Sequence, residues 1–174
     1  AVSPYLWKYF IRDDQKQRIL ALIDPSIDPD GLGVLWQTNK SLEALRNGGL
    51  TGQGLFHGDL TSIGYLPAQH TDSIFSSIGE QLGMLGCLAA LFLLLAIVLR
   101  CIQVGMKSPD YMNRLICIGI ASMLLFQILI NVGVCLGLFP VVGLALPFLS
   151  YGGSSLLASM MCIGLLLNFS RTAR

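Results

Sequence analysis

Residues 82–99 read LGMLGCLAALFLLLAIVL, an apolar run that contains no charged side chain and ends at Arg100. A helix needs about 20 predominantly apolar residues to cross the hydrocarbon core of a bilayer. Two later runs are equally free of charge and at least as long. We therefore predict three transmembrane helices, over residues 82–100, 115–139 and 150–170.

The composition is that of an all-α integral membrane protein. Of the 174 residues, 53% are hydrophobic and only 12% are charged, against roughly 25% charged residues in soluble domains. The mean hydropathy is +0.67. A net charge of +1 without a basic stripe argues against a nucleic-acid partner. The five cysteines have no metal-ligand spacing, so we interpret them as small hydrophobic residues.

Basic residues set the expected orientation. Those beyond residue 99 flank the first connection between spans or follow the last span: Arg100, Lys107, Arg114, Arg171 and Arg174. The positive-inside rule makes that side cytoplasmic. Residues 101–114 are then a cytoplasmic loop and residues 171–174 a cytoplasmic tail. Residues 11–81 and 140–149 are extracytoplasmic.

The first part of the chain is polar but not featureless. Residues 1–10 are apolar yet too short to span a bilayer, so we expect the end of a truncated transmembrane helix and hence a fragment. Residues 11–81 contain too many apolar side chains for a disordered segment. We predict short amphipathic helices at the membrane surface there, with Arg18–Ile23 and Lys40–Leu45 as the best candidates.

The sequence PAQHTD, residues 67–72, places His70 and Asp72 just before the first span. An aspartate there is most often a helix N-cap, a role that Thr71 or Ser73 could also fill. Alternatively, its carboxylate is a general base for an acceptor hydroxyl of a substrate at the bilayer surface. Glu80 is the nearest later carboxylate, and we interpret it as structural.

Glycines are concentrated between residues 47 and 58, next to Arg46. Their amides could cradle a phosphate, and Arg46 could bind it in bidentate fashion. The segment lacks the P-loop pattern, so a flexible turn is the simpler interpretation.

Polar residues also interrupt the later spans. Gln127 and Asn131 lie one turn apart on one helix face, where they favour either a helix–helix hydrogen bond or a polar pathway. The sequence SYGGSS, residues 150–155, and Pro147 break the third run near its start. We expect an irregular entry there that is covered by protein or water, with the hydroxyls lining a polar cavity or forming a re-entrant turn.

Together these motifs resemble, in order and spacing, the C-terminal portion of a SEDS protein, the family of RodA, FtsW and SpoVE. The resemblance covers nearly the whole chain and is carried by these residues: Asp14-Gln15, Arg18, Asp28-Pro29, Gln37, Ser41, Gly48-Gly49, Leu66 to Asp72, Asn131-Val132-Gly133, Leu138-Phe139-Pro140, Leu146-Pro147 and Ser150 to Ser155. The opening Asp-Gln-x-x-Arg and the His57-Gly58 pair favour RodA.

The resemblance implies a ten-span protein of the bacterial inner membrane. Such a protein polymerises lipid II into glycan strands for cell shape or division, beside a class B penicillin-binding protein. It implies that Asp72 is the essential catalytic carboxylate. We expect the substrate to be contacted by His70, Gln69, Arg46, Lys40, Ser150 and Ser154. A cation must offset the negative charge that develops on the leaving pyrophosphate. Arg46 is the first candidate, with Lys40 or a divalent metal ion such as Mg²⁺ or Mn²⁺ as alternatives.

Two further functions stay open at this stage. A lipid II flippase would use Gln127, Asn131 and the hydroxyls of residues 150–155 as a polar pathway. A non-catalytic scaffold would only dock the penicillin-binding protein. The chain also departs from the family pattern at several positions. Gln53 stands where a lysine is common, and Asp59-Leu60 stands where Thr-Gln is typical.

Overall fold

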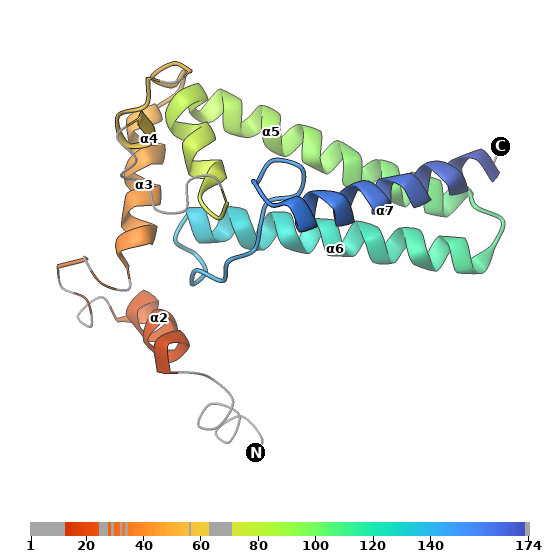
Figure 1. Cartoon of the computed structure of the whole chain (residues 1–174), viewed down its shortest axis with the longest axis horizontal. Helices are drawn as coiled ribbons and strands as arrows, with labels where there is room; N and C mark the ends of the chain where they lie inside the picture. The colour runs from red at the N-terminus through yellow and green to blue at the C-terminus, as the bar shows by residue number, and fades with distance from the viewer. Residues whose placement is uncertain are drawn as a thin grey trace.

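The computed structural model describes residues 13–24, 28, 30–31, 33, 35–55, 57–62 and 71–172. All regular secondary structure in these residues is α-helical (Figure 1). The helices are α2 (Asp13–Ile23), α3 (Trp36–Gly48), α4 (Asp59–Ser62), α5 (Ile74–Lys107), α6 (Tyr111–Cys135) and α7 (Gly153–Thr172).

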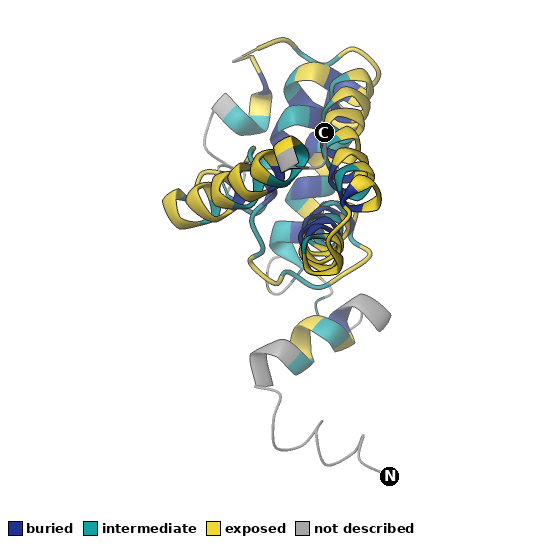
Figure 2. Ribbon diagram, turned by 90° about the vertical axis from the view of Figure 1, so that its right-hand side faces the viewer, coloured by how far each residue is buried: buried dark blue, intermediate teal, exposed yellow. Residues whose placement is uncertain are grey.

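Three helices, α5, α6 and α7, are long and apolar enough to cross a membrane, as the sequence predicts. Helices α5 and α6 pack against each other along their lengths, whereas α7 runs obliquely to them and touches each only in part (Figure 2). The short helices α3 and α4 lie at the end of the bundle where α5 begins (Figure 1). The prediction of an all-α membrane protein with three spans is confirmed for the described residues.

The inward faces of α5 and α6 form the core. The buried side chains include Leu94 and Val98 of α5 and Leu124 and Ile128 of α6. The outward faces expose large apolar side chains, for example Phe92, which is 72% exposed. Figure 2 shows this division as dark blue inside the bundle and yellow along its outer faces. Such a surface suits contact with lipid or with further apolar helices.

Helix α5 begins at Ile74, before the predicted span, and bends at Gly83. Its first turns run beside α3 and the rest runs along the bundle (Figure 1). Gly83 has φ 70° and ψ −168°, a conformation that only glycine adopts readily. The span predicted from residue 82 therefore starts close to this bend.

The glycine-rich segment supplies hydrogen bonds that the bent helix lacks. Met84 N donates to Gly49 O at 2.9 Å, and Gln53 N donates to Glu80 O at 3.0 Å. A Cβ added at Gly83 would overlap the backbone of Gly52 and Leu50. The bend is thus held by close backbone contact, which explains why glycines occur on both sides of it.

Helices α2 and α3 cover the two segments for which the sequence predicts short helices. Helix α3 buries Thr38, Ser41, Ala44 and Gly48 and packs on the first turns of α5. A Cβ at Gly48 would overlap the carbonyl oxygen of Gly79, so the two backbones are in direct contact. Location of these helices at a membrane surface remains a prediction, as do the loop boundaries and the orientation. Residues 1–10 lie outside the described residues.

Candidate functional site

An open cleft of about 600 Å³ lies at the end of the bundle where α6 ends and α7 begins. It is lined by residues of α6, of the connection to α7, of α7 itself and of the segment before α5: Thr71, Asp72, Met123, Gln127, Gly143, Leu144, Ala145, Tyr151, Gly152, Ser154, Ser155, Ala158 and Ser159. Asp72 is the one carboxylate among these lining residues. The cleft therefore combines a single acidic group with hydroxyl and amide side chains.

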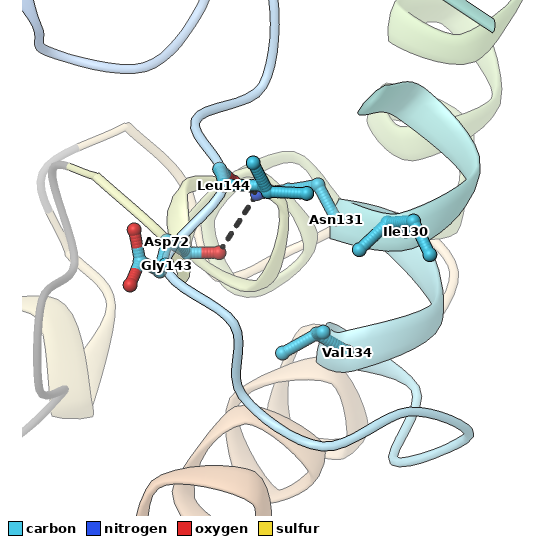
Figure 3. Close-up of a pocket in the computed structure, with 6 residues that line it drawn as sticks. All are labelled: Asp72, Ile130, Asn131, Val134, Gly143 and Leu144. Carbon is cyan, nitrogen blue, oxygen red and sulfur yellow. Dashed lines mark hydrogen bonds between the residues drawn. The ribbon is translucent and has the colours of Figure 1, made fainter. Parts of the chain in front are cut away.

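The main chain at Asp72 is held by α6. Asn131 Nδ2 donates to Asp72 O at 3.2 Å and to Leu144 O at 2.7 Å. Cys135 Sγ lies 3.5 Å from the same Asp72 oxygen. Figure 3 shows the Asp72 carbonyl directed toward Asn131 and its carboxylate directed away from it. The backbone is thus anchored while the carboxylate remains outside this contact.

Ser150 anchors the preceding residue. Its Oγ donates to Thr71 O at 2.6 Å and accepts from Leu146 N at 2.7 Å. A tight turn presents it: Leu149 N donates to Leu146 O at 3.3 Å, and Phe148 has φ 64°. A left-handed conformation costs a non-glycine residue on the order of 1–2 kcal/mol. The irregular entry predicted before the third span is therefore a strained turn that holds the segment containing Asp72.

Asp72 does not cap α5. The N-cap position belongs to Ser73, which makes no side-chain cap hydrogen bond. Ser41 Oγ of α3 instead donates to Ser73 Oγ at 3.4 Å. No residue in the described part of the chain donates a hydrogen bond to the Asp72 carboxylate. The common structural explanation for an aspartate at this place is therefore absent.

The cleft brings only part of the predicted site together. Ser154 is exposed and lines it with Asp72. Ser150 is 8% exposed and uses its hydroxyl in the two backbone contacts above. His70 and Gln69 lie outside the described residues. Gln127, for which the sequence predicts a helix–helix hydrogen bond or a polar pathway rather than a catalytic site, also lines the cleft. Its position one turn before Asn131 was the available signal.

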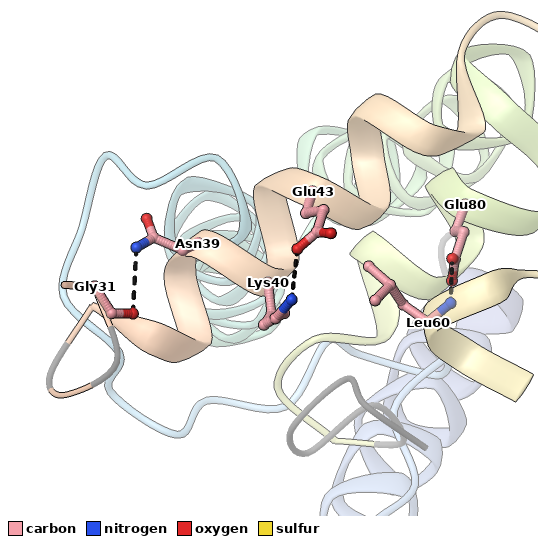
Figure 4. A network of polar contacts seen from close by, with 6 residues as sticks. All are labelled: Gly31, Asn39, Lys40, Glu43, Leu60 and Glu80. Atoms are coloured by element: carbon pink, nitrogen blue, oxygen red, sulfur yellow. Dashed lines mark hydrogen bonds and ion pairs between the residues drawn. The ribbon is translucent and has the colours of Figure 1, made fainter. Parts of the chain in front are cut away.

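The predicted basic residues lie on α3 and do not line the cleft. Lys40 Nζ forms an ion pair with Glu43 Oε2 at 2.7 Å (Figure 4). Arg46 is exposed in the last turn of α3. Both remain predicted substrate contacts.

The glycine-rich segment does not present a free row of amides. Gln53 N and Gly54 N donate to Glu80 O and Gln81 O, each at 3.0 Å. Because these two amides are already hydrogen-bonded to the backbone, they do not form a phosphate cradle. The Gln53 side chain is also engaged: Nε2 donates to Asp59 Oδ2 at 3.2 Å, and Oε1 accepts from Asp59 N at 2.9 Å. The two departures from the family pattern thus contact each other.

Glu80 is fully buried, with 0% exposure. Its carboxylate accepts from Leu60 N at 2.7 Å (Figure 4), from Thr61 N at 3.0 Å and from the Thr61 hydroxyl. These contacts hold α4 against α5, which agrees with a structural interpretation. Among the described residues, no group of three or more His, Cys, Asp or Glu side chains is arranged to hold a metal ion.

Comparison with known proteins shows the family to which this chain is similar. A family model described as a cell cycle protein of the FtsW, RodA and SpoVE type matches residues 1–174. A probable peptidoglycan glycosyltransferase FtsW from Trichlorobacter lovleyi is 44% identical over 88% of this chain and 40% of its own length. The peptidoglycan glycosyltransferase MrdB of Escherichia coli K12 is 35% identical over 97% of this chain and 45% of its own. Stage V sporulation protein E of Bacillus subtilis is 42% identical, over 91% and 42%.

Two solved structures are similar in fold. One comes from a peptidoglycan synthase complex described as coordinating polymerization and crosslinking, with a TM-score of 0.74, 32% identity and coverage of 99% of this chain and 45% of the other. The other is the rod shape determining protein RodA of Thermus thermophilus, with a TM-score of 0.59, 38% identity and coverage of 70% and 37%. The chain spans less than half the length of these relatives. Relatives of both the FtsW and RodA type match, so the RodA subtype remains a prediction. From its sequence and its fold, the chain belongs to the FtsW, RodA and SpoVE family, the SEDS proteins.

Proposed function

We propose that the protein to which this chain belongs is a peptidoglycan glycosyltransferase that polymerises lipid II. One observation carries the proposal: among the described residues that line the cleft, Asp72 is the single carboxylate, its backbone is anchored by Asn131, and it does not serve as the N-cap of α5. The relatives named above as peptidoglycan glycosyltransferases support it.

In the proposed reaction, a sugar hydroxyl of one lipid-linked disaccharide attacks the anomeric carbon of a second. A carbon–oxygen bond forms, and the bond from that carbon to undecaprenyl pyrophosphate breaks with inversion. Asp72 accepts the proton of the attacking hydroxyl, or orients that hydroxyl, and the pyrophosphate leaves with the bonding electron pair. Because pyrophosphate is a good leaving group, the mechanism does not require a second carboxylate as general acid.

The charge that develops on the leaving group needs compensation. Arg46 is our first candidate, with Lys40 as an alternative, and His70 would orient the base or a phosphate. Ser154 and Gln127 line the cleft and have the hydrogen-bonding groups that a sugar requires. If a divalent ion such as Mg²⁺ takes part, Asp72 is the one cleft carboxylate available to it. Most of its oxygen ligands would then come from substrate phosphates and water.

We further propose that the cleft faces the extracytoplasmic side of the inner membrane. It lies at the end of the bundle opposite the predicted cytoplasmic loop, which contains Lys107 and Arg114. Lipid-linked substrates would enter it from the outer leaflet. A class B penicillin-binding protein is the proposed partner, supported by the similarity to a synthase complex that coordinates polymerization and crosslinking.

A lipid II flippase is the less favoured alternative. It requires Gln127 and Asn131 to present polar groups to a pathway, but Asn131 is 2% exposed and its amide nitrogen is bonded to two backbone carbonyls. If the protein were only a scaffold, the Asp72 carboxylate that lines the cleft would have no role.

The substitution Asp72→Ala in the full-length protein separates these functions. If the protein is a glycosyltransferase, the rate of glycan polymerisation by the variant is expected to fall at least about 100-fold. Lipid II transport and partner binding are expected to be unchanged. The control Asp30→Asn changes an exposed carboxylate of the long loop and is expected to leave all three readouts unchanged. Undiminished glycan product from Asp72→Ala would exclude the proposal.

A further inference from the structure

Asn131 is the buried amide of α6 and contacts residues far from it in the chain. Its Nδ2 donates to Asp72 O, 59 positions away, and to Leu144 O, 13 positions away. Both acceptors are backbone carbonyls, and within the amide group only the nitrogen can donate a hydrogen bond, so the amide nitrogen must face them. The geometry therefore fixes the orientation of the Asn131 side chain.

These two hydrogen bonds join two neighbouring segments that both line the cleft. Asp72 precedes α5, Leu144 belongs to the connection before α7, and both line the cleft. In Figure 3 the Asp72 carbonyl points toward Asn131 while the carboxylate points away from it. Because the hydrogen bond fixes the Asp72 carbonyl, it also fixes the part of the main chain from which the carboxylate side chain projects into the cleft.

The Asn131 side chain is a poor choice for packing alone. Its Oδ1 is buried and has no hydrogen-bond partner among the described residues. An unpaired buried acceptor is destabilising, so the value of this side chain lies in the two backbone carbonyls that its nitrogen holds. The small cavity of about 10 Å³ that Asn131 lines with Asp72 and Leu144 leaves little room for movement.

We propose that Asn131 is a positioning residue for the reaction: it holds Asp72 and Leu144 in register so that the Asp72 carboxylate faces the acceptor hydroxyl. This inference rests on the proposed glycosyltransferase function. Asn131 is buried and is not among the residues that line the cleft, so its proposed contribution is to the geometry of the general base.

The test uses steady-state lipid II polymerisation by the full-length protein in vesicles. Asn131→Leu removes the unpaired acceptor and both hydrogen bonds, and it leaves the carbonyls of Asp72 and Leu144 without that donor, so kcat is measured per folded molecule. We expect its kcat to fall roughly 10- to 100-fold while KM changes by less than about threefold. Asn131→Gln keeps the amide but displaces it by one methylene, and its kcat is expected to lie between wild type and Asn131→Leu. Ser122→Ala is the matched control, because Ser122 is exposed on the same helix and bonds only Gly119 O within it.

Each outcome has a defined meaning. Wild-type kcat per folded molecule in Asn131→Leu, even with a lower yield, would show a merely structural role and overturn the inference. A raised KM with unchanged kcat would also overturn it, since Asn131 would then act in substrate binding. If Asn131→Leu does not fold, wild-type kcat in Asn131→Gln contradicts the inference and a lowered kcat with constant KM supports it. Asp72→Ala is measured alongside: activity there refutes the proposed function itself, whereas inactivity there with active Asn131 variants refutes only this inference.

Discussion

At the scale of single residues, two carboxylates near the start of α5 have opposite surroundings. Glu80 is fully buried and accepts hydrogen bonds from the amides of Leu60 and Thr61. Asp72 lines the cleft, and no described residue donates a hydrogen bond to its carboxylate. The difference separates a carboxylate used to hold the fold from one available for chemistry.

Glu80→Ala is expected to lower the free energy of unfolding by about 1–3 kcal/mol, because it leaves the part-buried amides of Leu60 and Thr61 without their acceptor. Thermal unfolding of the purified protein in detergent measures the change. The control is Glu43→Ala, which removes a half-exposed carboxylate whose ion pair with Lys40 is worth at most about 1 kcal/mol. Equal effects of the two substitutions would contradict the structural role of Glu80.

Gln53 and Asp59, two residues that depart from the family pattern, are expected to stabilise the fold through their mutual hydrogen bond. Their side chains form a hydrogen bond of 3.2 Å in an exposed setting. A double-mutant cycle with Gln53→Ala and Asp59→Ala should give a coupling energy of about 0.5–1 kcal/mol in unfolding experiments. Strictly additive effects would mean that the contact contributes nothing to stability.

At the scale of elements, the sequence predicted the three spans and the two short helices because apolar runs and amphipathic segments are local signals. It did not predict what the glycines do. The segment from Gly48 to Gly54 was open to interpretation as a phosphate cradle or a turn, yet it packs on the bend of α5 at Gly83. That contact joins parts of the chain about 30 residues apart, and no local pattern reveals it.

Gly48→Ala tests this packing. The added methyl group would overlap the Gly79 carbonyl and force α3 away from α5, so we expect a loss of about 1–3 kcal/mol in the free energy of unfolding. Gly119→Ala in α6 is the matched control, because a Cβ there meets no atom within 4 Å. Its expected effect is neutral or stabilising by up to about 1 kcal/mol. A Gly48→Ala protein as stable as the control would contradict direct backbone contact between α3 and α5.

The site shows the same limit of sequence reasoning. Asp72 and Ser154 were predicted and share the cleft. For Asn131 the sequence favours a helix–helix hydrogen bond or a polar pathway, whereas its partners are the loop carbonyls of Asp72 and Leu144. Ser150 was predicted as a substrate contact, and its hydroxyl bonds backbone on both sides. In each case the residue type predicts that the side chain forms hydrogen bonds, but only the tertiary structure shows with which partner.

At the scale of the whole molecule, the long apolar helices form a bundle, and the short helices α3 and α4 lie at one end of it (Figure 1). The cleft lies at that end, and basic residues such as Lys107 lie at the other. An impermeant thiol reagent added outside intact cells should therefore label Ser154→Cys, while Lys107→Cys should be labelled only after permeabilisation. Both positions are exposed, whereas the native cysteines are buried or half-buried. The reverse pattern would contradict the orientation.

The central claim is that the Asp72 carboxylate carries the chemistry of this cleft. Asp72→Asn tests it most directly, because the amide keeps the size of the side chain and the Asn131 hydrogen bond to the backbone while removing the base. Measured as kcat for lipid II polymerisation by folded, full-length protein in vesicles, the variant is expected to fall by roughly 10²- to 10⁴-fold. A kcat within about threefold of wild type would contradict the claim.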